Sequence, residues 1–419
     1  MKFYLRNNMK ETKKYKPIFK IYSKALIFLV MLIMCLFFVN LIPNSLIYDN
    51  LQESIIYYNK IDYQSMVGDT NFSKNDASAD STALNLMMNS DNKRPLYSTL
   101  IAPAYRDFNS QDFIKMGYDT IINDKEANYD YNRYWHGYQI VWRPLLMITN
   151  VRGIMLAMLI AYIILLGFTI YKSYATNNKL FGISLVLMNI GYIIPFGFTA
   201  LEYIPVFFIY LISCLLLLYK KDYRLVFSCS GIAVAFFDFL TAETLTLTIP
   251  LLLYAVLNKK NLKIKDTIIA CVSWLISYCS TFIVKWGISS LIYQKNYFSI
   301  ALDKYNTHEM LFGRLFSVKY NINTLLGNTM TFNNSFWLFI SIILVLIIIV
   351  YLFRKNSTSS KYLLCMLAIC MIPYIRYFVL AGHSWAYQWF TYRAQLVLIP
   401  VLVLTLSELD FSLVGRRKK

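Results

Sequence analysis

The sequence has few charged residues, few histidines and little glycine. Only 15% of its 419 residues are charged, and 57% are hydrophobic. Charged residues make up about a quarter of an average soluble domain. Glycine occurs 14 times, and the three histidines are His136, His308 and His383. This composition excludes an ordinary soluble globular domain and predicts a helical protein that crosses a membrane several times.

The sequence also lacks the motifs of nucleotide and hydrolase chemistry. It contains no glycine-rich phosphate loop, Walker sequence, GxSxG or HExxH. Its seven cysteines all lie in apolar stretches, and their spacings match neither a zinc site nor a redox CxxC pair. We therefore expect buried cysteines without disulfides and no cytosolic nucleotide chemistry. No metal site is predicted, and although a divalent cation is compatible with the sequence, nothing in it requires one.

Long apolar runs recur along the chain. A helix that spans the hydrocarbon core needs roughly 20 apolar residues. Ten candidate stretches lie at residues 25–43, 154–171, 180–199, 203–219, 225–241, 244–257, 267–292, 336–353, 362–381 and 394–411. The stretch at 244–257 is short for a separate span. The predicted fold class is all-α, a polytopic helical membrane protein with about ten transmembrane helices and a large first outer loop.

The spans divide the chain into predicted parts. These are a basic tail at 1–24, a first transmembrane helix at 25–43, an outer loop domain at 44–150, a helical membrane domain at 151–411 with a second outer loop at 293–334, and a basic tail at 412–419. The first 43 residues also have the layout of a signal peptide. Their apolar core is long, however, and no small-residue cleavage site follows it. We therefore expect an uncleaved membrane anchor.

Basic residues gather at alternate ends of the predicted spans. The first 24 residues hold eight lysines and arginines, and more follow in the turns at 172–179, 220–224, 259–265 and 354–361. Because such residues are retained on the cytoplasmic side, we expect a cell-membrane protein with both termini in the cytoplasm. The net charge of +18 is then explained by topology and by attraction to anionic lipid. Nucleic acid is not a predicted partner, because the charges are split among short turns.

Ionisable residues in or beside a span are costly and are candidates for function. Asp238 and Glu243 bracket a tight turn between two apolar stretches, and we predict catalytic roles for both. Lys285 lies inside a predicted helix, where a carboxylate or a phosphate would neutralise its ammonium group. The alternative is a structural ion pair between Lys285 and Asp238 or Glu243.

Two runs combine arginine and histidine with aromatic residues in predicted outer loops. Arginine binds phosphate through two parallel hydrogen bonds, and the faces of Trp and Tyr pack against sugar rings. An aromatic belt at the membrane surface explains many of the 34 tyrosines. Such a belt does not require histidine and arginine within it. The predicted substrate-binding residues are Arg133, Trp135, His136, Arg143, Lys285, Arg376, His383, Trp385, Tyr392 and Arg393.

Two acids follow the first apolar stretch. Asp49 and Glu53 lie four residues apart, on one face of a predicted helix. We predict that they are further catalytic residues, and the alternative is that they are ordinary solvated acids. A carboxylate in this position would take a proton from an acceptor hydroxyl while cations stabilise a departing lipid phosphate.

This layout resembles the integral-membrane glycosyltransferases of the GT-C superfamily. The resemblance rests on the many spans, the large first outer loop and the surface-lying helices, with Asp49 and Glu53 roughly where that superfamily places its acid. The adjacent acidic pair common in that superfamily is absent here. Three segments, 133–138, 238–241 and 390–393, also resemble uncharacterised multispanning proteins of low-GC Gram-positive bacteria that are linked to surface-polysaccharide genes.

The predicted function is accordingly that of a glycosyltransferase-like membrane protein. It would move a sugar from a polyprenyl-phosphate carrier to an envelope glycopolymer or lipid at the outer face. Its predicted partners are membrane lipid, lipid-linked sugar and an envelope glycan acceptor. The alternatives are a transporter or flippase of a lipid-linked saccharide, a polymerase or ligase, and a non-enzymatic scaffold. A transporter would favour polar residues at mid-membrane depth and an internal repeat.

Overall fold

The fold is known from a computed structural model that describes residues 2–60, 77–301, 322–327 and 360–408. Helices make up 78% of the structure, so the all-α prediction is confirmed. In the described ranges, the only strands are β1 (Pro103–Ala104) and β2 (Tyr129–Asp130), which form one short antiparallel pair with Pro103 opposite Asp130.

Seven described segments are long and apolar enough to cross a membrane, as expected of a multi-pass membrane protein. They are Lys20–Val39 in α1 (Lys2–Val39), α7 (Val151–Ala175), Lys179–Phe196, Leu201–Leu218, α13 (Ile264–Tyr293), Lys361–Val379 in α18 (Ser360–Val379), and Gln388–Leu406. Two shorter apolar helices are α11 (Tyr223–Phe237) and α12 (Leu245–Leu257). The predicted span at 336–353 lies outside the described residues, so the count of ten stays a prediction.

Three of these seven segments are built from several shorter helices. Lys179–Phe196 comprises α8 (Lys179–Met188), the π-helix η3 (Asn189–Ile193) and α9 (Ile194–Phe196). Leu201–Leu218 comprises the 3-10 helix η4 (Leu201–Tyr203) and α10 (Ile204–Leu218). Gln388–Leu406 comprises α20 (Gln388–Thr391), η6 (Tyr392–Val397) and α21 (Leu398–Leu406), and α19 (Ala381–Ala386) precedes it.

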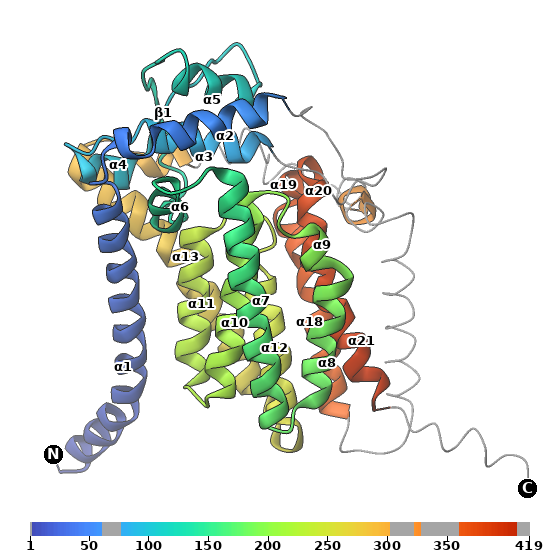
Figure 1. The fold of residues 1–419 in the computed structure, drawn as a ribbon. Coiled ribbons are helices and arrows are strands. Elements are labelled where there is room, and N and C mark those ends of the chain that lie inside the picture. The colour runs from blue at the N-terminus through green and yellow to red at the C-terminus, as the bar shows by residue number, and fades with distance from the viewer. Residues whose placement is uncertain (1, 61–76, 302–321, 328–359, 409–419) are drawn as a thin grey trace, which may run out of the picture.

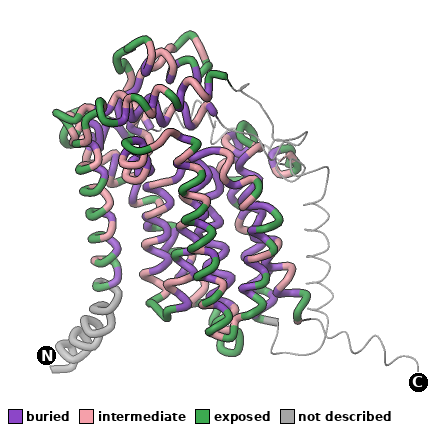
Figure 2. Tube along the Cα trace, viewed as in Figure 1, coloured by how far each residue is buried: buried purple, intermediate pink, exposed green. Residues whose placement is uncertain are grey.

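The long helices differ in how deeply they are buried. In Leu201–Leu218, 72% of the most apolar window is buried, against 22% in Lys20–Val39 and in α7. Leu201–Leu218 is therefore central in the bundle, whereas Lys20–Val39 and α7 are exposed along much of their length (Figure 2). Their exposed residues include apolar side chains such as Leu26, Ile27 and Ile164. An outward apolar surface on a helix of this length is the arrangement expected in lipid.

A group of short helices covers one end of the bundle (Figure 1). This cap consists of α2 (Tyr48–Lys60), α3 (Ala77–Met88), α4 (Pro95–Ile101), α5 (Phe113–Ile121) and the β1–β2 pair, and α6 (Gln139–Leu146) connects it to the bundle. Leu51, Ile55 and Tyr58 recur at helical spacing on α2 and pack on apolar residues of α3 and α5. The other face of α2 is therefore left to solvent.

Two buried polar residues join the cap to the bundle. The carboxylate of Asp80 accepts hydrogen bonds from the Tyr58 hydroxyl (2.5 Å) and from the backbone N–H groups of Leu201 (2.9 Å) and Glu202 (3.3 Å). It thereby caps the first turn of η4 at the start of a bundle helix.

The other joint is Arg143, which is completely buried. Its guanidinium donates to the carbonyls of Met87 (2.5 Å) and Ile42 (2.6 Å) and to the amide oxygen of Asn44 (3.0 Å). Burial lowers the pKa of Arg143 to about 10. All three contacts are to uncharged oxygens of the chain. Arg143 therefore acts as a structural joint that connects α6 with α3 and with the residues that follow α1.

Basic residues lie at the opposite end of the bundle from the cap. The turns there join α7 to α8, α10 to α11, and α12 to α13 through η5 (Lys259–Asn261) (Figure 1). They carry Lys172, Lys179, Lys220, Lys221, Arg224, Lys259, Lys260, Lys263 and Lys265. The cap and the basic turns thus mark two chemically different ends of the molecule.

Candidate functional site

Two loops at the cap end carry five of the fourteen candidate residues. One runs from Tyr131 to Tyr138, between β2 and α6, and the other is the turn between α11 and α12. Gly137 lets the loops meet, because its backbone N–H donates to the carbonyl of Phe236 (2.9 Å). A Cβ atom at Gly137 would lie 2.6 Å from that carbonyl oxygen and would also collide with the Phe236 ring.

Each loop contains a non-glycine residue in the left-handed region. The φ angle is 56° at His136 and 66° at Leu240. Such conformations are uncommon for residues with a side chain and cluster at functional sites. Phe239 ties the loops together, because its ring stacks on Tyr138 at 4.8 Å and lies 6.1 Å from Tyr134.

Asp238 closes the turn after α11. Its carboxylate accepts hydrogen bonds from the backbone N–H of Thr241 (3.0 Å) and from the hydroxyl of the same residue (2.6 Å). Burial and the nearby charge of Glu243 raise the pKa of Asp238 to about 7. A carboxyl group with this pKa can accept or release a proton near neutral pH.

Glu243 forms a buried ion pair with Arg376 of α18. The Nε atom of Arg376 donates to Glu243 Oε1 at 2.8 Å, and both side chains are 4% exposed. The same guanidinium donates to the Ser384 hydroxyl (2.7 Å) and to the Leu240 carbonyl (2.8 Å). Arg376 therefore fixes the α11–α12 turn against α19.

His383 lies beside this ion pair and is half-buried. Its Nδ1 atom is 3.3 Å from the guanidinium of Arg376. Burial, together with the positive charges of Arg376 and Arg133, lowers the pKa of His383 well below its ordinary value. The imidazole is therefore neutral at pH 7.

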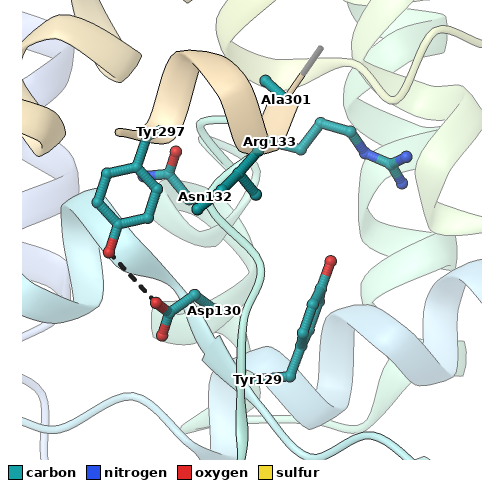
Figure 3. A pocket seen from close by; sticks show the side chains of 7 residues that line it. Tyr129, Asp130, Asn132, Arg133, Tyr297 and Ala301 are labelled. Atoms are coloured by element: carbon teal, nitrogen blue, oxygen red, sulfur yellow. Dashed lines mark hydrogen bonds between the residues drawn. The ribbon is translucent and has the colours of Figure 1, made fainter. Parts of the chain in front are cut away.

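Arg133 is a half-buried cation among aromatic rings. Its guanidinium donates to the Tyr131 hydroxyl (3.1 Å) and lies 4.9 Å from the centre of the Tyr134 ring. In Figure 3 it is directed away from Asp130. Asp130 instead accepts from Lys295 (2.9 Å) and from the Tyr297 hydroxyl (3.2 Å). The cavity in Figure 3 holds about 10 Å³, room for one water molecule and no larger ligand.

Lys285 is completely buried in α13. Its ammonium group donates to the backbone carbonyl of Tyr134 and lies 5.3 Å from the centre of the Trp135 ring. Trp135 is held by its indole N–H, which donates to the Thr281 carbonyl (2.8 Å). Among the described residues no ion pair joins Lys285 to Asp238 or Glu243, and Glu243 pairs with Arg376 instead. Neither Lys285 nor Arg133 belongs to any of the five ion pairs among the described residues.

His136 is buried between the two loops. Its Nε2 atom lies 3.0 Å from the Tyr131 carbonyl, and its Nδ1 atom lies 3.3 Å from the Tyr138 hydroxyl. Burial and the charges of Lys285 and Arg133 lower its pKa well below the ordinary value. The neutral ring therefore serves as a hydrogen-bonding spacer that shapes the loop carrying Arg133.

Seven predicted site residues are thus brought together, and we call this set the cap-side cluster. Its members are Arg133, His136, Asp238, Glu243, Lys285, Arg376 and His383, with Trp135 packed behind Lys285. In the described ranges, no group of three or more His, Cys, Asp or Glu side chains is placed to bind a metal ion. The cluster is richer in cations than in acids, and its two half-buried members are Arg133 and His383.

The other predicted site residues have different surroundings. Arg393 is buried against the Tyr203 ring (3.8 Å) and donates to the Trp389 carbonyl, and its neighbour Tyr392 is also buried. Trp385 is 45% exposed. Asp49 and Glu53 are exposed on α2, where Glu53 accepts from the side-chain amide of Asn150 (2.9 Å).

Three residues of the site were not singled out from the sequence. Thr241 bonds Asp238, Ser384 bonds Arg376, and Tyr278 of α13 contacts Phe282 (5.3 Å), whose ring lies 6.4 Å from Tyr134. Asp followed three residues later by Thr is typical of an Asx turn, so the pairing of Thr241 was open to prediction. Nothing local points to Ser384 or Tyr278.

Comparisons with known proteins add no family to this picture. No protein-family model, no curated protein and no solved structure matches the chain.

Proposed function

We propose that this chain is a membrane glycosyltransferase of the GT-C type that uses a sugar linked to a polyprenyl phosphate. The observation that carries the proposal is Arg133, a half-buried cation outside the ion pairs of the described residues, whose loop packs through Tyr134 on Phe239, the neighbour of Asp238. A phosphate would supply the missing negative charge, and a guanidinium binds it through two parallel hydrogen bonds.

The reaction assigns a distinct task to each part of the cluster. The oxygen of an acceptor hydroxyl bonds to the anomeric carbon of the sugar, and the bond from that carbon to the phosphate oxygen breaks. The phosphate leaves with the electron pair, and Arg133 stabilises its charge. Asp238 receives the proton of the hydroxyl. The products are the glycosylated acceptor, an envelope glycan or lipid, and polyprenyl phosphate.

The buried groups support these tasks without touching the substrate. Lys285 is completely buried and adds positive potential behind the loop of Arg133. The Glu243–Arg376 pair holds the turn that presents Asp238. In this proposal the base is Asp238, because Asp49 and Glu53 are exposed on α2, apart from the contacts that define the cluster.

The orientation in the membrane forms part of the proposal. The basic turns lie at the end of the bundle opposite the cap, and basic turns are retained in the cytoplasm. The cap and the cluster would then face the outer side, with both termini inside. Acceptor glycans of the cell envelope are found on that side.

The direct test is transfer by the purified protein in nanodiscs. The protein is incubated with a radiolabelled polyprenyl-phosphate sugar and an envelope glycan acceptor, and label in the acceptor is counted. Arg133→Ala should lower transfer by about 100-fold or more, as expected for loss of a charge that stabilises the leaving group. The matched control is Arg94→Ala, because the Arg94 side chain is 68% exposed and pairs with Asp91 in the cap.

Three outcomes would contradict the proposal. One is no transfer by the wild-type protein with any donor sugar tested. A second is equal transfer by the two arginine variants. The third is movement of fluorescent lipid-linked sugar between leaflets without transfer, which would indicate a flippase.

A further inference from the structure

Four aromatic side chains follow one stripe of α13. Trp274, Tyr278, Phe282 and Trp286 are spaced by four residues, and their ring centres are separated by 5.0, 5.3 and 6.0 Å in succession. Twelve residues of helix are about 18 Å long, more than half of a hydrocarbon core of roughly 30 Å. We call this stripe the α13 ladder.

The upper rungs of the ladder are open on one side. Tyr278, Phe282 and Trp286 are only half-buried, whereas Tyr162, Tyr192 and Tyr210, in other helices of the bundle, are almost completely buried. Packing in the core therefore does not use the full surface of these rings. An apolar surface of this kind along a span is available to a hydrocarbon chain.

The lower end of the ladder is closed. Trp274 is 5% exposed, and its indole N–H donates to the Thr246 hydroxyl of α12 (3.0 Å). Its ring stacks on Tyr278 with an angle of 8° between the two planes. The ladder is thus buried against α12 at Trp274, and its other three rings, toward the cap, are half-buried.

The open part of the ladder leads to the cap-side cluster. Phe282 lies 6.4 Å from the Tyr134 ring, over which the Arg133 guanidinium is placed at 4.9 Å. One aromatic ring therefore separates the ladder from the proposed phosphate site. The Tyr134 ring also lies 6.1 Å from the ring of Phe239, the residue after Asp238, so the same aromatic ring connects the ladder with the turn of the proposed base.

We propose that the α13 ladder binds the polyprenyl chain of the carrier lipid, with the phosphate at Arg133 and the chain directed down α13 toward Trp274. This inference rests on the proposed function, because it takes the phosphate site from it. The occupant is a single long hydrocarbon chain with an anionic head, since aromatic rings line the ladder and the half-buried cation Arg133 lies next to its cap-side end. A soluble sugar phosphate would use the cations and leave the rings uncovered.

Photocrosslinking tests the position of the chain without requiring turnover. Polyprenyl phosphate carrying a benzophenone within its chain is irradiated with the protein in nanodiscs, and the labelled peptides are identified by mass spectrometry. Label should concentrate on α13 between Tyr278 and Trp286. Phe282→Ala should reduce this label about fivefold, the loss expected for removing contact with one half-buried ring.

The helix supplies a matched control. Ile283 is adjacent to Phe282 but 54% exposed, so Ile283→Ala should leave the label unchanged. Phe282→Leu, which keeps an apolar side chain, gives a second variant if the alanine variant fails to fold. A benzophenone-bearing polyprenol without phosphate should label α13 far less, because it lacks the anionic head.

The outcomes separate this inference from the proposed function. Label on α13 that depends on phosphate and on Phe282, in a protein with no transferase activity, supports the ladder and overturns the transferase. Transfer activity with label on other helices overturns the ladder alone. Equal loss in the Phe282 and Ile283 variants, or equal labelling by polyprenol, also overturns the ladder.

Discussion

The Glu243–Arg376 ion pair gives the sharpest test of the packing at the cap end. Both side chains are 4% exposed, with a charged hydrogen bond of 2.8 Å between them. Replacing one partner leaves the other charge buried alone, which costs about 3–5 kcal/mol. We expect Arg376→Met to be the more damaging single change, because it also removes the bonds to Ser384 and Leu240. The double variant Glu243→Gln, Arg376→Met should lose clearly less stability than the sum of the two.

Thermal unfolding in detergent measures these differences. A chain of this length should shift by about 1–2 °C per kcal/mol, judged from roughly 2–4 °C for chains of 150–250 residues. Each single variant should therefore melt about 3–10 °C lower. The exposed pair Asp91–Arg94, with side chains 30% and 68% exposed, is the control and should give a coupling energy below about 1 kcal/mol. Additive effects at Glu243 and Arg376, within about 0.5 kcal/mol, would refute a buried pair.

Three further predictions follow from neighbouring residues. The raised pKa of Asp238, about 7, means that the folded protein holds a proton that the unfolded chain has released above pH 4, so stability falls as pH rises toward 7. The free energy of unfolding of Asp238→Asn should therefore rise by about 2–3 kcal/mol relative to that of the wild type as the pH is raised from about 5 to about 8. Denaturant titrations at both pH values measure this difference, and a difference that does not change with pH would contradict the prediction. Gly137→Ala should lower the free energy of unfolding by about 3 kcal/mol, because the added Cβ atom collides with Phe236. An unchanged or higher melting temperature would contradict this contact. Arg143→Met should cost about 3 kcal/mol and expose the cap to limited proteolysis, since three oxygens of the chain lose their donor. Unchanged digestion would argue against a joint at Arg143.

The helices were largely predictable from the sequence, for a physical reason. In lipid every backbone polar group must be bonded within its own segment, so an apolar run of sufficient length can hardly be anything but a helix. Apolar helices accordingly occupy the predicted stretches at 154–171, 203–219 and 267–292, with ends shifted by a few residues. The last described helical segment begins earlier than predicted, at Gln388 instead of 394. Polar and aromatic residues at its start, such as Gln388 and Tyr392, hid the beginning of the helix from a hydropathy pattern.

The partners of the charged residues were not predictable in the same way. Glu243 and Arg376 are 133 residues apart, and only the packing of α18 against the α11–α12 turn brings them together. The same limit applies to Arg143, which looks like a phosphate-binding arginine in sequence but bonds three oxygens of the chain. Asp49 and Glu53 share one face of α2 as expected, and it is the exposed face. Sequence spacing gives the face of a helix, whereas burial depends on what packs against it.

The bonds of Asp80 also impose an order on biosynthesis. Asp80 precedes its two backbone partners, Leu201 and Glu202, by 121 and 122 residues. At 5–20 residues per second, a ribosome takes about 6–24 s to cover that interval. During this time Asp80 can bond Tyr58 but not the start of η4. The cap therefore cannot form its Asp80 bonds to the bundle until the segment that begins at Leu201 has been synthesised. In a nascent chain stalled before that point, these hydrogen bonds between the cap and the bundle are missing.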